Sequence, residues 1–139
     1  MYPCLKKYIA FCDTMATNNI CDFGLPDWCS PTDDWHKQCE SAVTDTAYYY
    51  YDVLTVSKIA MVLGLDREAQ EYKRKADEIR HSFRQTFIKQ TDKKLELSCT
   101  QCQTSLGCML YFGLVNDDEK AMFMDALISE LHERKEHLD

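Results

Sequence analysis

The sequence alternates between helical segments that are apolar on most faces and segments that are apolar on one side only. Residues 43–63 belong to the first kind, with tyrosines and aliphatic residues distributed around the helix axis. Residues 67–89 belong to the second kind, with one apolar stripe opposite a charged face. A helix that is apolar on most faces is buried on most faces, whereas a one-sided helix covers the outside of a core. The alternation therefore predicts inner helices flanked by outer helices.

The same alternation extends over the whole chain and predicts an all-α fold of about five helices. The expected outer helices are 2–16, 67–89 and 117–136, and the expected inner helices are 43–63 and 100–112. Gly64 and Gly113 directly follow the inner helices, where glycine typically ends a helix. Long polar loops at 17–41 and 90–99 precede both inner helices. The repeating unit is thus a helical hairpin of roughly fifty residues, as in helical arrays that form solenoids or closed rings, and both loops should lie at one end.

Composition excludes several classes of partner. The chain has 139 residues and a net charge of −7, with 45% hydrophobic residues, which suffices for one domain with a core. It contains no extended basic cluster, so neither nucleic acid nor an anionic membrane surface is an expected partner. Its apolar runs are shorter than a membrane span, and its N-terminus lacks the apolar run of a signal peptide. These features leave the cellular compartment undetermined.

The eight cysteines allow two interpretations. Small secreted scaffolds of this cysteine content are rich in loops and short of core, whereas this sequence predicts long helices, which favours mostly reduced thiols. Cys99 and Cys102 form a C-x-x-C pair, but the sequence shows neither a second ligand pair for zinc nor a thioredoxin-like frame. The four histidines have no metal-binding spacing, and no glycine-rich phosphate loop is present. We therefore expect no metal and no cofactor.

The candidate site residues are Asp27, Trp28, Trp35 and Gln103. Tryptophan beside a carboxylate is typical of a carbohydrate site, because the ring covers the C–H face of a sugar and the carboxylate accepts hydrogen bonds from its hydroxyls. Alternatively, the tryptophans cover the core and Asp27 forms an Asx-turn. Gln103 could bind substrate from a helix N-terminus, or it could form a capping box with Thr100.

Several motifs together resemble the six-hairpin catalytic domain of bacterial α-L-rhamnosidases. They are Gly24-Leu25-Pro26-Asp27-Trp28, Thr46-Ala47-Tyr48-Tyr49-Tyr50, Ile59-Ala60 with Leu63-Gly64, and Gln103-Thr104 with Phe112-Gly113-Leu114-Val115. The resemblance covers nearly the whole chain, although the family usually has glycine where this chain has Pro26. It implies an (α/α)6 toroid of helical hairpins, of which residues 1–139 would supply about two and a half.

The resemblance also implies what the chain lacks. Enzymes of the family that this chain resembles use two acidic residues. The resemblance implies a general acid upstream of the Asp-Trp loop and a general base downstream of the Gln-Thr helix. Neither carboxylate is expected within residues 1–139, so we interpret the chain as a middle segment of an inverting glycosidase that acts on terminal α-L-rhamnosides. Such a segment would contribute substrate contacts and no catalytic residue. It would be inactive alone, and its uncovered inner helices would favour self-association.

A helical-repeat protein-interaction module is the alternative function. Residues 65–76 have the character of a tetratricopeptide helix. That repeat is about 34 residues long with short turns, whereas the unit here is nearer fifty and includes a loop that carries two tryptophans. The longer unit favours the glycosidase interpretation.

Overall fold

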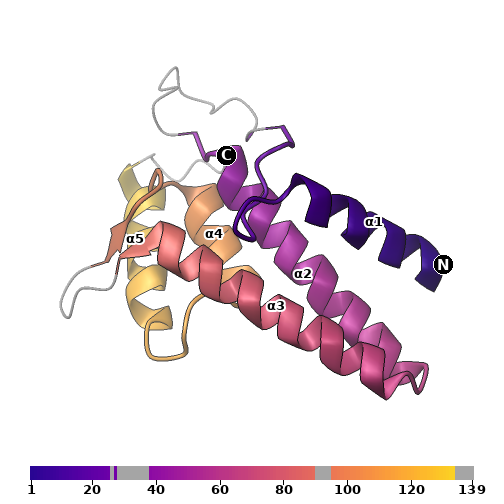
Figure 1. Cartoon of the computed structure of the whole chain (residues 1–139). Helices are drawn as coiled ribbons and strands as arrows, with labels where there is room; N and C mark the ends of the chain where they lie inside the picture. The colour runs from indigo at the N-terminus through magenta and orange to yellow at the C-terminus, as the bar shows by residue number, and fades with distance from the viewer. Residues whose placement is uncertain (26, 28–37, 90–94, 134–139) are drawn as a thin grey trace.

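The computed structural model describes residues 1–25, 27, 38–89 and 95–133, and these residues form five helices (Figure 1). The helices are α1 (Tyr2–Met15), α2 (Ser41–Val62), α3 (Asp66–Phe87), α4 (Gln103–Tyr111) and α5 (Lys120–Glu133). Their number and order confirm the predicted fold class. Within the described residues, no helix is both long and apolar enough to cross a membrane.

A short β-hairpin corrects the expectation of a helix to residue 89 followed only by loop. Strand β1 (Ile88–Lys89) pairs antiparallel with β2 (Glu96–Leu97), in the register Ile88 with Leu97 and Lys89 with Glu96. The Ser98 amide extends this pairing by donating to the Phe87 carbonyl at 2.9 Å. The helix ends where a β-branched residue, Ile88, takes an extended conformation with φ −113° and ψ 113°.

Helix α2 lies in the middle of the molecule and contacts α1, α3 and α4 (Figure 1). It buries one wide face, including Val43, Ala47, Val53 and Ala60, against these neighbours. The all-round burial predicted for it is found on only part of its circumference, because Tyr48, Met61 and Val62 are more than half exposed. Helix α3 buries a single stripe, as its one-sided pattern predicted: Ala69, Ala76, Ile79, Phe83 and Phe87.

Both inner helices end in the same glycine turn. Gly64 has φ +72° and Gly113 has φ +73°, values that favour glycine. After α2, the Leu65 amide donates to the Ala60 carbonyl at 2.9 Å, and the Gly64 amide donates to Met61 at 3.1 Å. Equivalent bonds after α4 join Leu114 to Met109 at 3.0 Å and Gly113 to Leu110 at 3.3 Å. These paired bonds define a Schellman motif at each turn and confirm that the two turns are equivalent.

Two arginines of α3 bind the turn that follows α4. The Arg84 guanidinium forms a bidentate ion pair with Glu119 at 2.7 and 2.8 Å and also donates to the Leu114 carbonyl at 3.0 Å. Arg80 donates to the carbonyls of Gly113 and Val115 at 2.9 and 3.0 Å. The Arg84 hydrogen bonds hold the pKa of the Glu119 carboxyl below its usual value, even though burial of the group opposes this. These bonds join the last turns of α3 to the turn that follows α4, and so hold the two hairpins together.

Candidate functional site

The chain ahead of α2 is bound to the first turns of that helix. The Thr46 hydroxyl accepts a hydrogen bond from the Cys21 amide at 3.0 Å. The Asp45 carboxylate accepts from the amides of Phe23 and Gly24 at 2.9 and 2.6 Å. A Cβ atom at Gly24 would lie 2.4 Å from Asp45 Oδ1, so any larger residue here would displace this carboxylate from its present position. These bonds fix the chain three residues before Asp27.

Asp27 then contacts α4, the other inner helix. The Thr104 hydroxyl, in the first turn of α4, donates to Asp27 Oδ2 at 2.6 Å. A second carboxylate makes a parallel connection, since both oxygens of Glu40 accept from the Thr100 amide at 2.9 and 3.0 Å. The Thr100 hydroxyl also donates to Glu40 at 2.9 Å. The segments that precede α2 and α4 therefore lie at one end of the molecule, as the hairpin pattern predicted.

The structure brings two of the four candidate residues to this place. Asp27 accepts a hydrogen bond from Thr104, and Gln103 is the neighbouring residue in the first turn of α4, where it is 9% exposed. Trp28 and Trp35 lie outside the described residues. No contact in the described part of the chain tests whether any of the four binds a sugar, so their role stays a prediction.

The predicted capping box of Thr100 and Gln103 is wrong. Helix α4 begins at Gln103, so Cys102 is its N-cap residue and Ser105 completes the capping box. The Ser105 amide donates to Cys102 Sγ at 3.5 Å, and the Cys102 amide donates to Ser105 Oγ at 3.0 Å. Cysteine is not among the preferred N-cap residues, which is why the sequence pattern placed the start of the helix too early.

Three residues of this region escaped the sequence-based reasoning: Glu40, Asp45 and Thr104. Each stands at the beginning of an inner helix, where a polar side chain is usually interpreted as a cap or as a partner of the helix dipole. The acidic residues at the start of α2 were a usable signal, because a carboxylate there can also bind amides of an approaching segment. The contact between Asp27 and Thr104 could not be predicted from the sequence, because the two residues are 77 positions apart.

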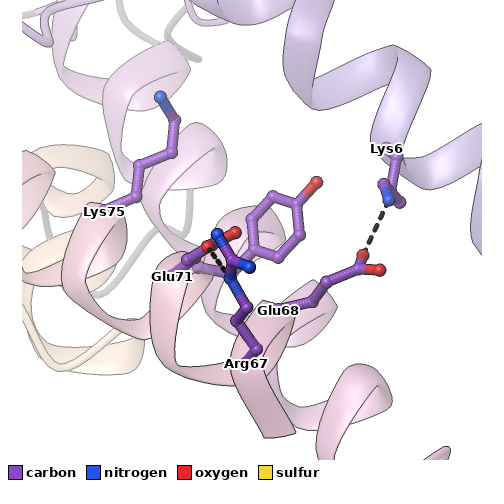
Figure 2. A pocket seen from close by; sticks show the side chains of 6 residues that line it. Lys6, Arg67, Glu68, Glu71 and Lys75 are labelled. Atoms are coloured by element: carbon purple, nitrogen blue, oxygen red, sulfur yellow. Dashed lines mark hydrogen bonds and ion pairs between the residues drawn. The ribbon is translucent and has the colours of Figure 1, made fainter. Parts of the chain in front are cut away.

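A second polar surface lies between α1 and α3 (Figure 2). Figure 2 shows Lys6 pointing toward Glu68, and Arg67 beside Glu71. The ion-pair distances are 2.7 Å between Lys6 and Glu68 and 3.0 Å between Arg67 and Glu71. Lys75 pairs with Asp13 at 2.8 Å. Each of the three cations is thus matched by a carboxylate of the same chain, and the groove contains none of the four candidate residues. It is a surface of structural ion pairs.

The chemistry available at the candidate site is hydrogen bonding by carboxylate, amide and hydroxyl groups. Among the described residues, no group of three or more His, Cys, Asp or Glu side chains has an arrangement that could hold a metal ion. The seven cysteines in the described ranges form no disulfide in this structure, and their redox state stays a prediction.

Comparison with known proteins gives a consistent result. Residues 1–139 match the model of the bacterial alpha-L-rhamnosidase 6 hairpin glycosidase domain. The chain is 30% identical over 147 aligned residues to an alpha-L-rhamnosidase from Alteromonas sp. (strain LOR), covering 99% of this chain and 15% of that protein. The alpha-L-rhamnosidase structure from Dictyoglumus thermophilum is 32% identical to this chain and superposes with a TM-score of 0.81. The match covers 99% of this chain and 16% of the Dictyoglumus chain.

Two more distant structures show the same fold. The Streptomyces avermitilis alpha-L-rhamnosidase, solved in complex with L-rhamnose, superposes with a TM-score of 0.83 at 18% identity, over 96% of this chain and 12% of that one. The alpha-L-rhamnosidase structure from Aspergillus terreus superposes with a TM-score of 0.82 at 17% identity. The match covers 99% of this chain and 16% of that one. The chain therefore spans about a sixth or less of the length of these relatives.

Proposed function

The chain belongs to the family of bacterial alpha-L-rhamnosidase six-hairpin glycosidase domains, and from this premise we propose that it forms part of the sugar-contacting wall of a glycoside hydrolase acting on terminal α-L-rhamnosides. The observation that carries the proposal is the position of Asp27, which Thr104 holds where the segments preceding α2 and α4 lie together. A carboxylate has about four lone-pair sites, so one that is fixed by a hydroxyl can still accept hydrogen bonds from a sugar. Family membership favours this function over a helical-repeat interaction module.

The other candidate residues take complementary roles in this proposal. Gln103, beside Thr104, would offer an amide to a sugar hydroxyl from the N-terminus of α4. Trp28 follows Asp27 directly, and Trp35 lies a few residues later, so either ring could cover the C–H face of the sugar. None of these groups would be a catalytic residue, because each only binds and orients the sugar.

The acid and base in this proposal lie outside residues 1–139. Inversion at the anomeric carbon needs two carboxyl groups about 6.5–9.5 Å apart, with a water molecule between one of them and the sugar. The chain covers 15% of the Alteromonas enzyme, so hydrolysis is proposed for a longer protein that contains this chain. Within that protein, Asp27 would help to hold the sugar ring in the orientation that the acid and base require.

Steady-state hydrolysis of 4-nitrophenyl α-L-rhamnoside by the longer protein tests this assignment. Asp27→Asn keeps the size of the side chain and removes its charge, so we expect kcat/KM to fall about 10- to 100-fold, the loss of a charged hydrogen bond. Asp66→Asn is the matched control, because Asp66 begins α3, immediately after the glycine turn. Unchanged kcat/KM in Asp27→Asn would contradict the proposed role.

The isolated chain should not hydrolyse the same substrate. Without the acid and the base, the bound sugar would have no group to protonate the leaving oxygen or to activate water. Turnover above background by the purified 139-residue chain, lost on Asp27→Ala, would show that these groups lie within it after all.

We also propose that the isolated chain associates with a second copy of itself. On the inner helices, Tyr48 is 57% exposed and Tyr111 is 78% exposed, and both rings contact Phe112 at centroid distances of 5.0 and 5.1 Å. Val62 is 87% exposed at the end of α2. Exposed apolar surface of this kind favours association. Sedimentation at micromolar concentration should show a dimer or larger species, and a compact monomer would contradict the proposal.

A further inference from the structure

The side chain of Glu40 does not cap the helix that it precedes. Glu40 is the N-cap residue of α2, and its side chain makes no cap hydrogen bond. Its two carboxylate oxygens instead accept from the Thr100 amide, at 2.9 and 3.0 Å, and Oε1 also accepts from the Thr100 hydroxyl at 2.9 Å. The side chain of a typical N-cap residue bonds to the first amides of its own helix. Glu40 therefore connects the start of α2 to a segment 60 residues further along the chain.

Thr100 in turn contacts the beginning of α4. Its carbonyl accepts a hydrogen bond from Ser105 Oγ at 2.8 Å. Ser105 is fully buried, and its hydroxyl also accepts from the Cys102 amide at 3.0 Å within the capping box of α4. Because this one hydroxyl both donates and accepts, a shift of Thr100 would disturb the cap of the helix. Glu40 is thus linked through Thr100 and Ser105 to the first turn of α4.

The first turn of α4 carries two parts of the candidate site. Gln103 is the first residue of the helix, and Thr104, which follows it, donates to Asp27 Oδ2 at 2.6 Å. Asp27 and Glu40 both belong to the segment that precedes α2, so two carboxylates of one segment hold the start of α4 at two separate points. A single contact would leave this turn able to rotate about the bond, whereas two contacts fix its orientation. The position of Gln103 relative to the Asp27 carboxylate therefore depends on Glu40.

We propose that Glu40 is a positioning residue for sugar binding, which acts through Thr100 to hold the first turn of α4 where Gln103 and Asp27 contact one sugar together. The inference rests on the proposed function, because it takes Asp27 and Gln103 as the residues that bind the sugar. Glu40 itself touches no sugar atom in this role, since its carboxylate is bonded to Thr100. Binding groups that are fixed before the sugar arrives reduce the ordering cost of binding, so the loss of Glu40 should appear mainly as a higher KM.

Steady-state hydrolysis of 4-nitrophenyl α-L-rhamnoside by the longer protein tests the proposal. Glu40→Ala should raise KM about three- to tenfold, the range that corresponds to one hydrogen bond, and should change kcat by a smaller factor. Partial unfolding would instead lower the apparent kcat and leave KM unchanged, because only the folded enzyme binds substrate. Glu71→Ala is the matched control, since Glu71 is also an exposed glutamate and its bond goes to Arg67 of the same helix. A KM for Glu40→Ala equal to that of the control would overturn the proposal.

Substitutions of Thr100 test whether Glu40 acts through this residue. Thr100→Ser keeps both the hydroxyl and the amide that bond to Glu40, so it should retain the wild-type KM. Thr100→Val keeps only the amide, so it should raise KM by a smaller factor than Glu40→Ala does. In the Glu40→Ala background, Thr100→Val should have little further effect, because the two residues share one contact. Effects of the two substitutions that simply multiply would contradict action through Thr100.

A second double-mutant cycle separates failure of this inference from failure of the proposed function. If Glu40 positions the residues that bind the sugar, Glu40→Ala should raise KM by a smaller factor in the Asp27→Asn background than in the wild type. A lowered kcat/KM in Asp27→Asn, combined with an equal effect of Glu40→Ala in both backgrounds, would overturn this inference alone. An unchanged kcat/KM in Asp27→Asn would overturn the proposed function and this inference with it.

Amide hydrogen exchange of the longer protein without substrate measures the positioning directly. The amides of residues 101–106, which lie beyond the one that Glu40 accepts from, should exchange faster in Glu40→Ala than in the wild type, because the start of α4 has lost one of its two contacts. The amides of α3 should exchange at the wild-type rate, as should all of these amides in Glu71→Ala. Unchanged exchange over residues 101–106 in Glu40→Ala would overturn the positioning role, whatever the kinetic result.

Discussion

The two ends of the helical hairpins are built in different ways. At the turn end of each hairpin, which is residues 63–65 in one and 112–119 in the other, a glycine turn connects an inner to an outer helix, and Arg84 from the last turn of α3 binds Glu119 of the second turn. At the loop end, comprising residues 16–25, 27, 38–40 and 95–102, exposed carboxylates bind backbone amides of distant segments, as Glu40 does with Thr100. The turn end therefore depends on backbone conformation and one nearly buried ion pair. The loop end depends on several contacts between segments, of which those of Asp45 and Glu40 are exposed.

This difference separates stability from the candidate site. Binding residues commonly lie on loops positioned by a rigid scaffold, because loops can vary while the scaffold holds its shape. Asp27 lies at the loop end and Gln103 lies in the first turn of α4, whereas both glycine turns and Glu119, the partner of Arg84, belong to the turn end. Substitutions at the turn end should therefore reduce stability more than those at the loop end. All unfolding measurements below compare variants at one protein concentration, since association would shift the midpoint.

The largest expected effect is at the ion pair of the turn end. Arg84→Met should lower the free energy of unfolding by about 3–5 kcal/mol, because it leaves the Glu119 carboxylate, 8% exposed, without its partner. Urea denaturation followed by circular dichroism measures the loss. A loss no greater than that of the loop-end variants described below would invalidate the distinction between the two ends.

The pH dependence of the same variant sharpens the test. The Arg84 hydrogen bonds hold the pKa of the Glu119 carboxyl below its ordinary value of 4.5, so the pair stabilises the fold above that pH and loses this contribution as the pH falls. In Arg84→Met the unpaired carboxylate is protonated more readily on acidification. The difference in stability between wild type and variant should therefore shrink as the pH falls below about 4.5. A difference that is constant from pH 7 to pH 3 would exclude Glu119 as its source.

The glycines of the turn end should show the next largest effect. Gly64→Ala and Gly113→Ala should each cost about 1–2 kcal/mol, because both glycines have φ near +72° and a Cβ atom is strained there. Asn tolerates this conformation better, so Gly64→Asn and Gly113→Asn should cost less than the alanine variants. No atom lies within 4 Å of a Cβ at either position, so the cost is conformational. Equal losses for Ala and Asn would contradict this explanation.

Gly24, at the loop end, should behave differently from the turn glycines. A Cβ atom there would displace the Asp45 carboxylate, which lies 2.4 Å away, so Gly24→Ala should cost about 1 kcal/mol through the lost hydrogen bonds. Asn should give no relief, because the clash begins at Cβ. In the background of Asp45→Ala, the same substitution should cost much less, since the two residues share one contact. Additive losses in the double variant would show that the clash is relieved elsewhere.

The sequence predicted the turn end better than the loop end, and the particular residues show why. Gly64 and Gly113 act through their own backbone conformation, so a local pattern was enough to place both turns. The apolar stripe of α3 was also predicted correctly, because the spacing of its residues is a property of a single helix. Asp27 was identified as a candidate from its neighbours in sequence, but its contact with Thr104 depends on how two hairpins pack.

Other features of the loop end were missed for the same physical reason. The β1–β2 pairing joins residues on either side of residues 90–94, and two-residue strands carry almost no alternation to detect. Cys102 caps α4 with a thiol, which N-cap preferences do not anticipate. The exposed apolar face of α2 was predicted to be buried because periodicity reports the chemistry of a helix face and does not say which segment covers it.

The smallest expected effect concerns Glu40, and it tests whether the contacts of the loop end are worth little individually. Glu40 is exposed, so Glu40→Gln should lower the free energy of unfolding by only about 0.5–1 kcal/mol, although its carboxylate accepts three hydrogen bonds from Thr100. Thr100→Val removes the hydroxyl and keeps the amide, so the two substitutions should be coupled in a double-mutant cycle.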